Sequence, residues 1–137
     1  MASGAPGEQP DEQFLAMART RHAGDPRALA MLGARLMVGR DAPRSPADGL
    51  ALLHEAAGQN DAEAWNLLAV LAATGAGCEQ GWNAAYTALE RAAALGHKGA
   101  RRERQVLSAL RLTDAAATVT WIASANTRVL QIGRAHV

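Results

Sequence analysis

Apolar side chains recur along this chain at intervals of three and four residues, the spacing of one face of an α-helix. The first apolar stripe follows Asp11 and contains Phe14, Leu15, Met17 and Ala18. Five further stripes follow, separated by segments rich in glycine, proline or asparagine. The pattern therefore predicts six helices, which end at or near Gly24, Gly39, residues 58–60, residues 74–81, Gly96 and Leu112.

Aspartate stands directly before three of these predicted helices. Asp11, Asp25 and Asp61 can each accept hydrogen bonds from the free N–H groups of a first helical turn, so we expect them to be N-caps. Pro26 follows Asp25 and suits a first turn, where a missing N–H costs nothing.

The six stripes are related by an offset of 36 residues. The segment that starts at Gly24-Asp25 aligns with Asn60-Asp61 and then with Gly96-His97. The same offset places further residues in shared columns, namely Leu32 with Leu68, Gly39 with Gly75, Met17 with Leu53 and Leu89, and Ala56 with Ala92. A period of this length is typical of repeat arrays, in which each unit buries its apolar face on the next.

The repeated pattern resembles the Sel-one-like repeat family, a relative of the tetratricopeptide repeat. The residues that carry the resemblance are Ala28, Leu32 and Gly33 on a first helix, Gly39 and Gly75 in the loops, Leu68 in the second copy, Ala56-Ala57 and Ala92-Ala93 on a second helix, and Gly96-His97 after it. The likeness covers roughly residues 11–110. It implies an all-α fold, a short right-handed α/α superhelical solenoid of about three helical-hairpin repeats. It also implies an interaction scaffold with no catalytic residues, whose concave face binds a protein or peptide.

The second and third copies depart from that pattern. Arg101 and Arg104 stand where a leucine or an aromatic residue is expected, and Ala69 replaces the first-helix glycine of the second copy. The sixth helix is therefore either a polar-faced cap or a degenerate repeat.

Composition agrees with a helical globular protein. Alanine accounts for about a quarter of the 137 residues, aromatic residues make up 4%, and the formal net charge is +1. These values exclude a collagen, a disulfide scaffold and a fully disordered chain, and no excess of positive charge indicates nucleic acid. The predominance of alanine and of arginine over lysine suggests a GC-rich bacterial gene. The single cysteine, a first segment unlike a signal peptide, and the lack of a long apolar run predict a cytoplasmic protein without a membrane span.

Few side chains are candidates for chemistry. The four histidines, His22, His54, His97 and His136, lack metal-ligand spacing, and we interpret His97 as structural at a helix end. Cys78 is read as an ordinary loop thiol and Gly75-Ala76-Gly77 as a turn. We therefore expect no catalytic residue, cofactor or metal.

Candidate partner-binding residues lie late in the chain. Trp82 begins a helix directly after a loop, and we expect it to be exposed and to act as an interaction hot spot. Arg101 and Arg102 belong to a basic run that either meets an acidic partner or is a solvated face.

The two ends of the chain are expected to differ from its middle. Residues 1–10 read as a disordered arm, 11–112 as the helical repeat domain, and 113–131 as a linker to a missing C-terminal domain. One coding of residues 132–137, ATC GGA AGA GCA CAC GTC, matches the start of a common sequencing adapter, so this tail is read as non-native.

The linker suggests an alternative function. Residues 117–130 resemble a segment of bacterial proteins in which helical repeats precede a 2-oxoglutarate and iron-dependent oxygenase domain of the prolyl-hydroxylase type. The alternative is therefore an accessory region of such an oxygenase, whose His-x-Asp…His iron ligands this chain lacks.

Overall fold

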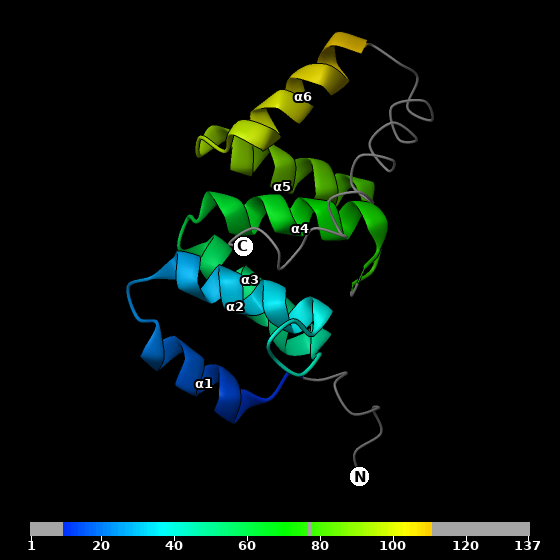
Figure 1. Ribbon diagram of the computed structural model, residues 1–137. Coiled ribbons are helices and arrows are strands. Elements are labelled where there is room, and N and C mark those ends of the chain that lie inside the picture. The colour runs from blue at the N-terminus through cyan, green and yellow to red at the C-terminus, as the bar shows by residue number, and fades with distance from the viewer. Residues whose placement is uncertain (1–9, 77, 111–137) are drawn as a thin grey trace.

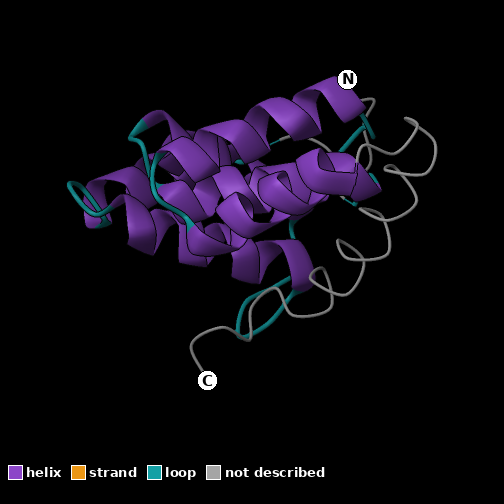
Figure 2. Ribbon diagram, turned by 90° about the horizontal axis from the view of Figure 1, so that it is seen from above, coloured by secondary structure: helices purple, strands orange, loops and turns teal. Residues whose placement is uncertain are grey.

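The computed structural model describes residues 10–76 and 78–110, which form helices joined by short loops (Figure 1). The helices are α1 (Glu12–Arg21), α2 (Pro26–Val38), α3 (Pro46–Gly58), α4 (Ala62–Thr74), α5 (Trp82–Ala94) and α6 (Lys98–Leu110). Within these ranges the fold is all-α, as the apolar pattern predicts, and Figure 2 shows no strand among them. The predicted arm, apart from exposed Pro10, lies outside the described residues, as do the predicted linker and tail and the segment resembling an oxygenase linker.

The helices are stacked, with α1 at one end and α6 at the other (Figure 1). α2 packs most extensively on α3, and α4 on α5. α3 and α4 join these two pairs, α2 also touches α4, and α6 packs on α5. α1 packs on α3. The closest pairs are thus α2–α3 and α4–α5, with single helices on either side.

Helix bounds recur with an offset of 36 residues. α2 spans residues 26–38, α4 spans 62–74 and α6 spans 98–110, while α3 spans 46–58 and α5 spans 82–94. We call two residues 36 positions apart counterparts. Because the bounds of these five helices coincide at both ends, counterparts occupy the same turn of matching helices. α1 matches α3 in the same register, but it begins two residues later and ends one residue earlier.

The helix ends recur in the same register. Asp25 and Asp61 accept hydrogen bonds from the backbone N–H groups of Ala28 (3.1 Å) and Ala64 (2.9 Å), which confirms both as N-caps. Asp11 caps α1 in the same way. α2 and α4 both end at a glycine with φ of 77°, Gly39 and Gly75, whose N–H groups donate to carbonyls four residues earlier.

The core consists mainly of leucine and alanine, contributed by all six helices. The largest fully buried side chains are Leu29, Leu52, Leu53, Leu71, Leu89 and Val70. α4 lies at the centre of the stack, and most of its residues are buried. Alanine on facing helices lets their backbones approach, because the methyl group fills little space.

The backbones of α2 and α3 approach each other closely at two glycines. A Cβ atom at Gly33 would lie 2.8 Å from the carbonyl oxygen of Gly49, and one at Gly49 would lie 2.6 Å from that of Gly33. Their counterparts are Ala69 and Ala85, both fully buried. The glycine that the family pattern assigns to this position is therefore needed in the first pair, while alanine fits in the second.

Candidate functional site

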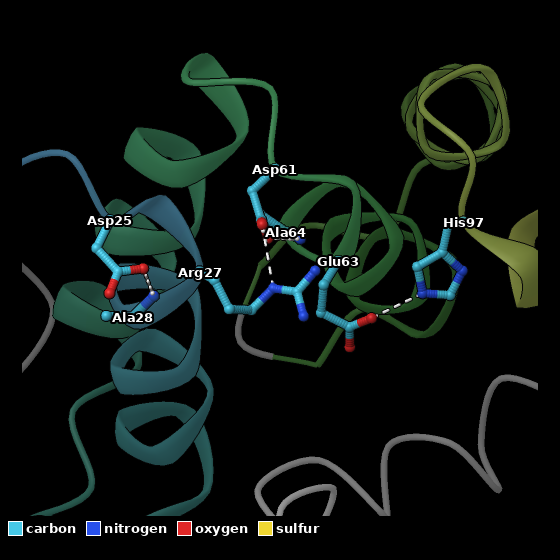
Figure 3. A network of polar contacts seen from close by, with 7 residues as sticks. All are labelled: Asp25, Arg27, Ala28, Asp61, Glu63, Ala64 and His97. Atoms are coloured by element: carbon cyan, nitrogen blue, oxygen red, sulfur yellow. Dashed lines mark hydrogen bonds and ion pairs between the residues drawn. The ribbon is translucent and has the colours of Figure 1, made fainter.

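Two polar contacts, together called the polar ladder, link the N-terminal ends of the alternate helices α2, α4 and α6 (Figure 3). The Nε atom of Arg27 on α2 lies 3.1 Å from Oδ1 of Asp61, the N-cap of α4. The Oε1 atom of Glu63 on α4 lies 2.7 Å from Nε2 of His97, which precedes α6. Glu63 is the counterpart of Arg27, and His97 of Asp61. The contact therefore recurs with donor and acceptor exchanged between the helices.

His97 performs two structural tasks at once. Its Nδ1 atom accepts a hydrogen bond of 3.1 Å from the N–H of Ala100, which caps the first turn of α6. Because Nδ1 accepts, the proton of the neutral ring resides on Nε2, which then donates to Glu63. This confirms the prediction that His97 is a structural residue at a helix end.

A groove of about 770 Å³ lies between α1 and α2. Its lining consists of Phe14, Ala16, Met17, Ala18, Thr20, Arg21, His22, Leu32 and Arg35. The apolar members form most of the surface, and Met17 is 68% exposed. The ionisable side chains of the lining are two arginines and a histidine, with no carboxylate among them. The groove thus combines an apolar floor with basic edges.

Arg35 is the unusual member of the lining. Its Nε atom is buried and has no hydrogen-bond partner, although the residue borders the groove. A buried guanidinium donor without an acceptor is costly, and a carboxylate is the acceptor that matches its geometry. This edge of the groove is therefore suited to a carboxylate.

Six of the nine groove-lining residues have counterparts that are buried inside the stack. Met17 corresponds to Leu53 (1% exposed), Thr20 to Ala56 (0%), and Arg35 to Leu71 (2%). Near those positions α2 packs against α3 and α4. No described helix occupies the corresponding place beside α1 and α2, so the groove has the position of a missing helix.

The sequence-predicted partner residues lie at the other end of the stack. Trp82 begins α5 and is half-buried against the core, with its ring 6.1 Å from that of Tyr86. The expectation of an exposed Trp82 is therefore only partly met, because the core covers part of the ring. Arg101 is exposed but its Nε donates to the carbonyl of Ala93 (3.0 Å), and Arg102 is exposed on α6. These three residues lie on α5 and α6, remote from the groove.

The residues singled out from the repeat pattern have structural positions. Six of them are buried in helix contacts, namely Gly33, Ala56, Ala57, Leu68, Ala92 and Ala93. Three others, Gly39, Gly75 and Gly96, have positive φ angles at chain turns. Leu32 alone belongs to the groove lining.

The remaining candidates show no reactive arrangement. Burial raises the pKa of the Cys78 thiol above its ordinary value, the opposite of what an activated nucleophile requires. In the described part of the chain, no three His, Cys, Asp or Glu residues come together to hold a metal ion. None of the helices described there is long and apolar enough to cross a membrane.

Sequence reasoning overlooked the groove, although its signal was present. Met17 shares a column with Leu53 and Leu89, which suggests a core residue, yet α1 is the first predicted helix. A core-type residue on the first described helix, with no other described helix covering it, indicates an open face.

Comparison with known proteins adds no relative. No protein-family model matches the chain, and no curated protein or solved structure is significantly similar to it.

Proposed function

We propose that this chain is a non-catalytic helical-repeat module that binds a protein or peptide. The pairs α2–α3 and α4–α5 are complete hairpin units of a Sel-one-like array with a period of 36 residues. α1 is then the second helix of a preceding unit and α6 the first helix of a following one. The six helices amount to three units, arranged as a short right-handed solenoid.

The observation that supports the proposal most directly is a recurrence. Helix bounds, caps and the polar ladder all repeat at the same offset of 36 residues. Arrays of this kind form extended surfaces from matching helices, and such surfaces commonly serve as binding sites. The α1–α2 groove is the site on this surface with the largest exposed apolar side chain, Met17. Trp82 at the start of α5 and Arg102 on α6 are two further candidate positions.

The test is a selection of peptides displayed on phage against the intact chain. We expect ligands whose binding is lost in Met17→Glu or in the pair Trp82→Ala and Arg102→Glu. Either loss places binding on a surface of the helix stack. A selection that yields no specific ligand, or ligands that tolerate all of these changes, contradicts the proposal. Circular dichroism of each variant verifies that the helices are retained.

A further inference from the structure

We infer that the α1–α2 groove binds an amphipathic helix that carries acidic residues, in the place of the first helix of a hairpin with α1. This inference rests on the proposed function and specifies the partner. The apolar face of the partner covers Met17 and Leu32, and its carboxylates meet Arg21 and Arg35.

The rest of the molecule shows what covers such a surface. α3 and α4 are the matching helices of α1 and α2, and α2 packs on both of them. On these two helices Leu53 and Leu71 are almost inaccessible, at 1% and 2% exposure. A helix with the relation of α2 to α3 would lie in the groove, antiparallel to α1, with its N-terminal end near His22.

The charges of the groove determine the chemistry of its partner. Ala57 and Leu71 are buried in the stack, but their counterparts are Arg21 and Arg35. A helix with a purely apolar packed face would leave the guanidinium groups of these arginines unpaired beneath it. Carboxylates on the incoming helix would give the buried Nε of Arg35 the acceptor it lacks. Acidic residues near the N-terminus of a helix are also favoured by its dipole.

Asp25 offers a further contact of the same kind. Its counterpart Asp61, the N-cap of α4, pairs with Arg27 of the matching helix α2 at 3.1 Å. Asp25 is exposed and caps α2. A partner helix in the inferred place can therefore present one basic residue in its first turn to Asp25, while its carboxylates face the arginines.

A second copy of this chain is a poorer occupant. The helix it would offer is α6, which lies at the opposite end of the stack (Figure 1). On α6 the counterparts of Asn66, Leu68 and Ala69 are Arg102, Arg104 and Gln105, all exposed. Its arginines would oppose Arg21 and Arg35, and like charges across an interface disfavour association.

The probe is a capped synthetic peptide with the sequence of residues 25–38, because α2 covers the matching surface in the stack. Ala30 and Ala34 lie one turn apart on the packed face of α2, at 0% and 3% exposure. The acidic probe carries Ala30→Glu and Ala34→Glu, and the matched basic probe carries Ala30→Lys and Ala34→Lys. Fluorescence anisotropy measures the binding of each peptide to the intact chain, and ¹³C-methyl NMR follows the Met17 methyl group.

We expect the acidic probe to bind about tenfold more tightly than the basic probe at low salt, and to shift the Met17 methyl resonance. Added NaCl should reduce the difference. Arg21→Ala with Arg35→Leu, which introduces the counterpart residues, should abolish the preference. Met17→Glu should abolish binding, whereas Val106→Glu, a matched change of an exposed apolar residue on α6, should not.

Several results would overturn the inference. These are equal binding of both probes, no binding of either, or unchanged binding to Met17→Glu. A Met17 methyl group shielded from a soluble paramagnetic probe in the free monomer would show that the chain itself fills the groove. A Met17 methyl resonance that moves with protein concentration, without added peptide, would identify a second copy of the chain as the occupant of the groove instead. If displayed peptides bind at Trp82 and Arg102 while the acidic probe fails, the repeat module stands and only this inference falls.

Discussion

At the scale of single residues, two helical glycines have opposite surroundings. A Cβ atom at Gly33 would approach the carbonyl oxygen of Gly49 to 2.8 Å, whereas one at Gly58 would meet nothing within 4 Å. We expect Gly33→Ala to lower the free energy of unfolding by about 1–3 kcal/mol, because the α2 and α3 backbones must separate. Gly58→Ala should raise it by about 0.5 kcal/mol, because alanine is the better helix former.

Urea denaturation of the two variants and the parent chain measures both changes. The alanines at the counterpart positions, Ala69 and Ala85, make the comparison strict, since the same helix crossing accepts methyl groups there. If Gly33→Ala and Gly58→Ala both raised the free energy of unfolding by the same amount, α2 and α3 would not be in close contact.

Cys78 gives a prediction about pH. Burial raises the pKa of its thiol, so at any pH below that value the folded chain holds less thiolate than the unfolded chain. We therefore expect iodoacetamide to alkylate Cys78 more slowly in the native protein than in urea, with the midpoint of the native rate profile displaced to higher pH. Mass spectrometry of the modified fraction across the pH range measures this. A native midpoint at or below the unfolded one would contradict the burial of the thiol.

At the scale of helices, the polar ladder predicts that its two versions are interchangeable. Arg27 with Asp61 and Glu63 with His97 join matching helix ends with opposite polarity. We expect Glu63→Arg and His97→Asp each to lower the free energy of unfolding by about 0.5–1 kcal/mol, because each leaves like charges or an imperfect pair. The double variant reproduces the Arg27–Asp61 arrangement and should recover most of that loss.

A double-mutant cycle from thermal or urea denaturation gives the coupling between the two positions. Combining His97→Asp with Glu12→Arg provides the control, because Glu12 is exposed on α1 at the far end of the stack. Additive effects in both pairs would show that Glu63 and His97 do not interact in solution.

The helices themselves were largely predictable from local sequence. Asp11, Asp25 and Asp61 mark helix starts because their side chains hydrogen-bond within the same turn, and such contacts depend on neighbours in the chain. The groove was not predicted, because it depends on which of the described helices pack beside α1. The partial burial of Trp82 likewise follows from packing on the core, which periodicity does not encode.

At the scale of the whole molecule, the two ends of the stack differ in character. α6 presents Arg102, Arg104 and Gln105 at positions where α4 carries buried residues. This end of the stack is therefore suited to contact with solvent. The α1 end presents Met17 at 68% exposure beside an apolar groove. A stack that is polar at one end and apolar at the other directs association toward α1, which is where the inferred helix binds.

This asymmetry predicts unequal effects at three positions that share one sequence column. Met17 is 68% exposed, while Leu53 and Leu89 are each 1% exposed, because α2 covers α3 and α4 covers α5. We expect Leu53→Ala and Leu89→Ala to lower the free energy of unfolding by about 2–5 kcal/mol, and Met17→Ala by less than about 0.5 kcal/mol. Urea denaturation of the three variants measures the difference. Adding the acidic probe should stabilise the parent chain but not Met17→Ala to the same extent, since the bound helix converts Met17 into a buried residue like its counterparts. A cost for Met17→Ala equal to that of Leu53→Ala would mean that the α1 face is already covered in the free protein.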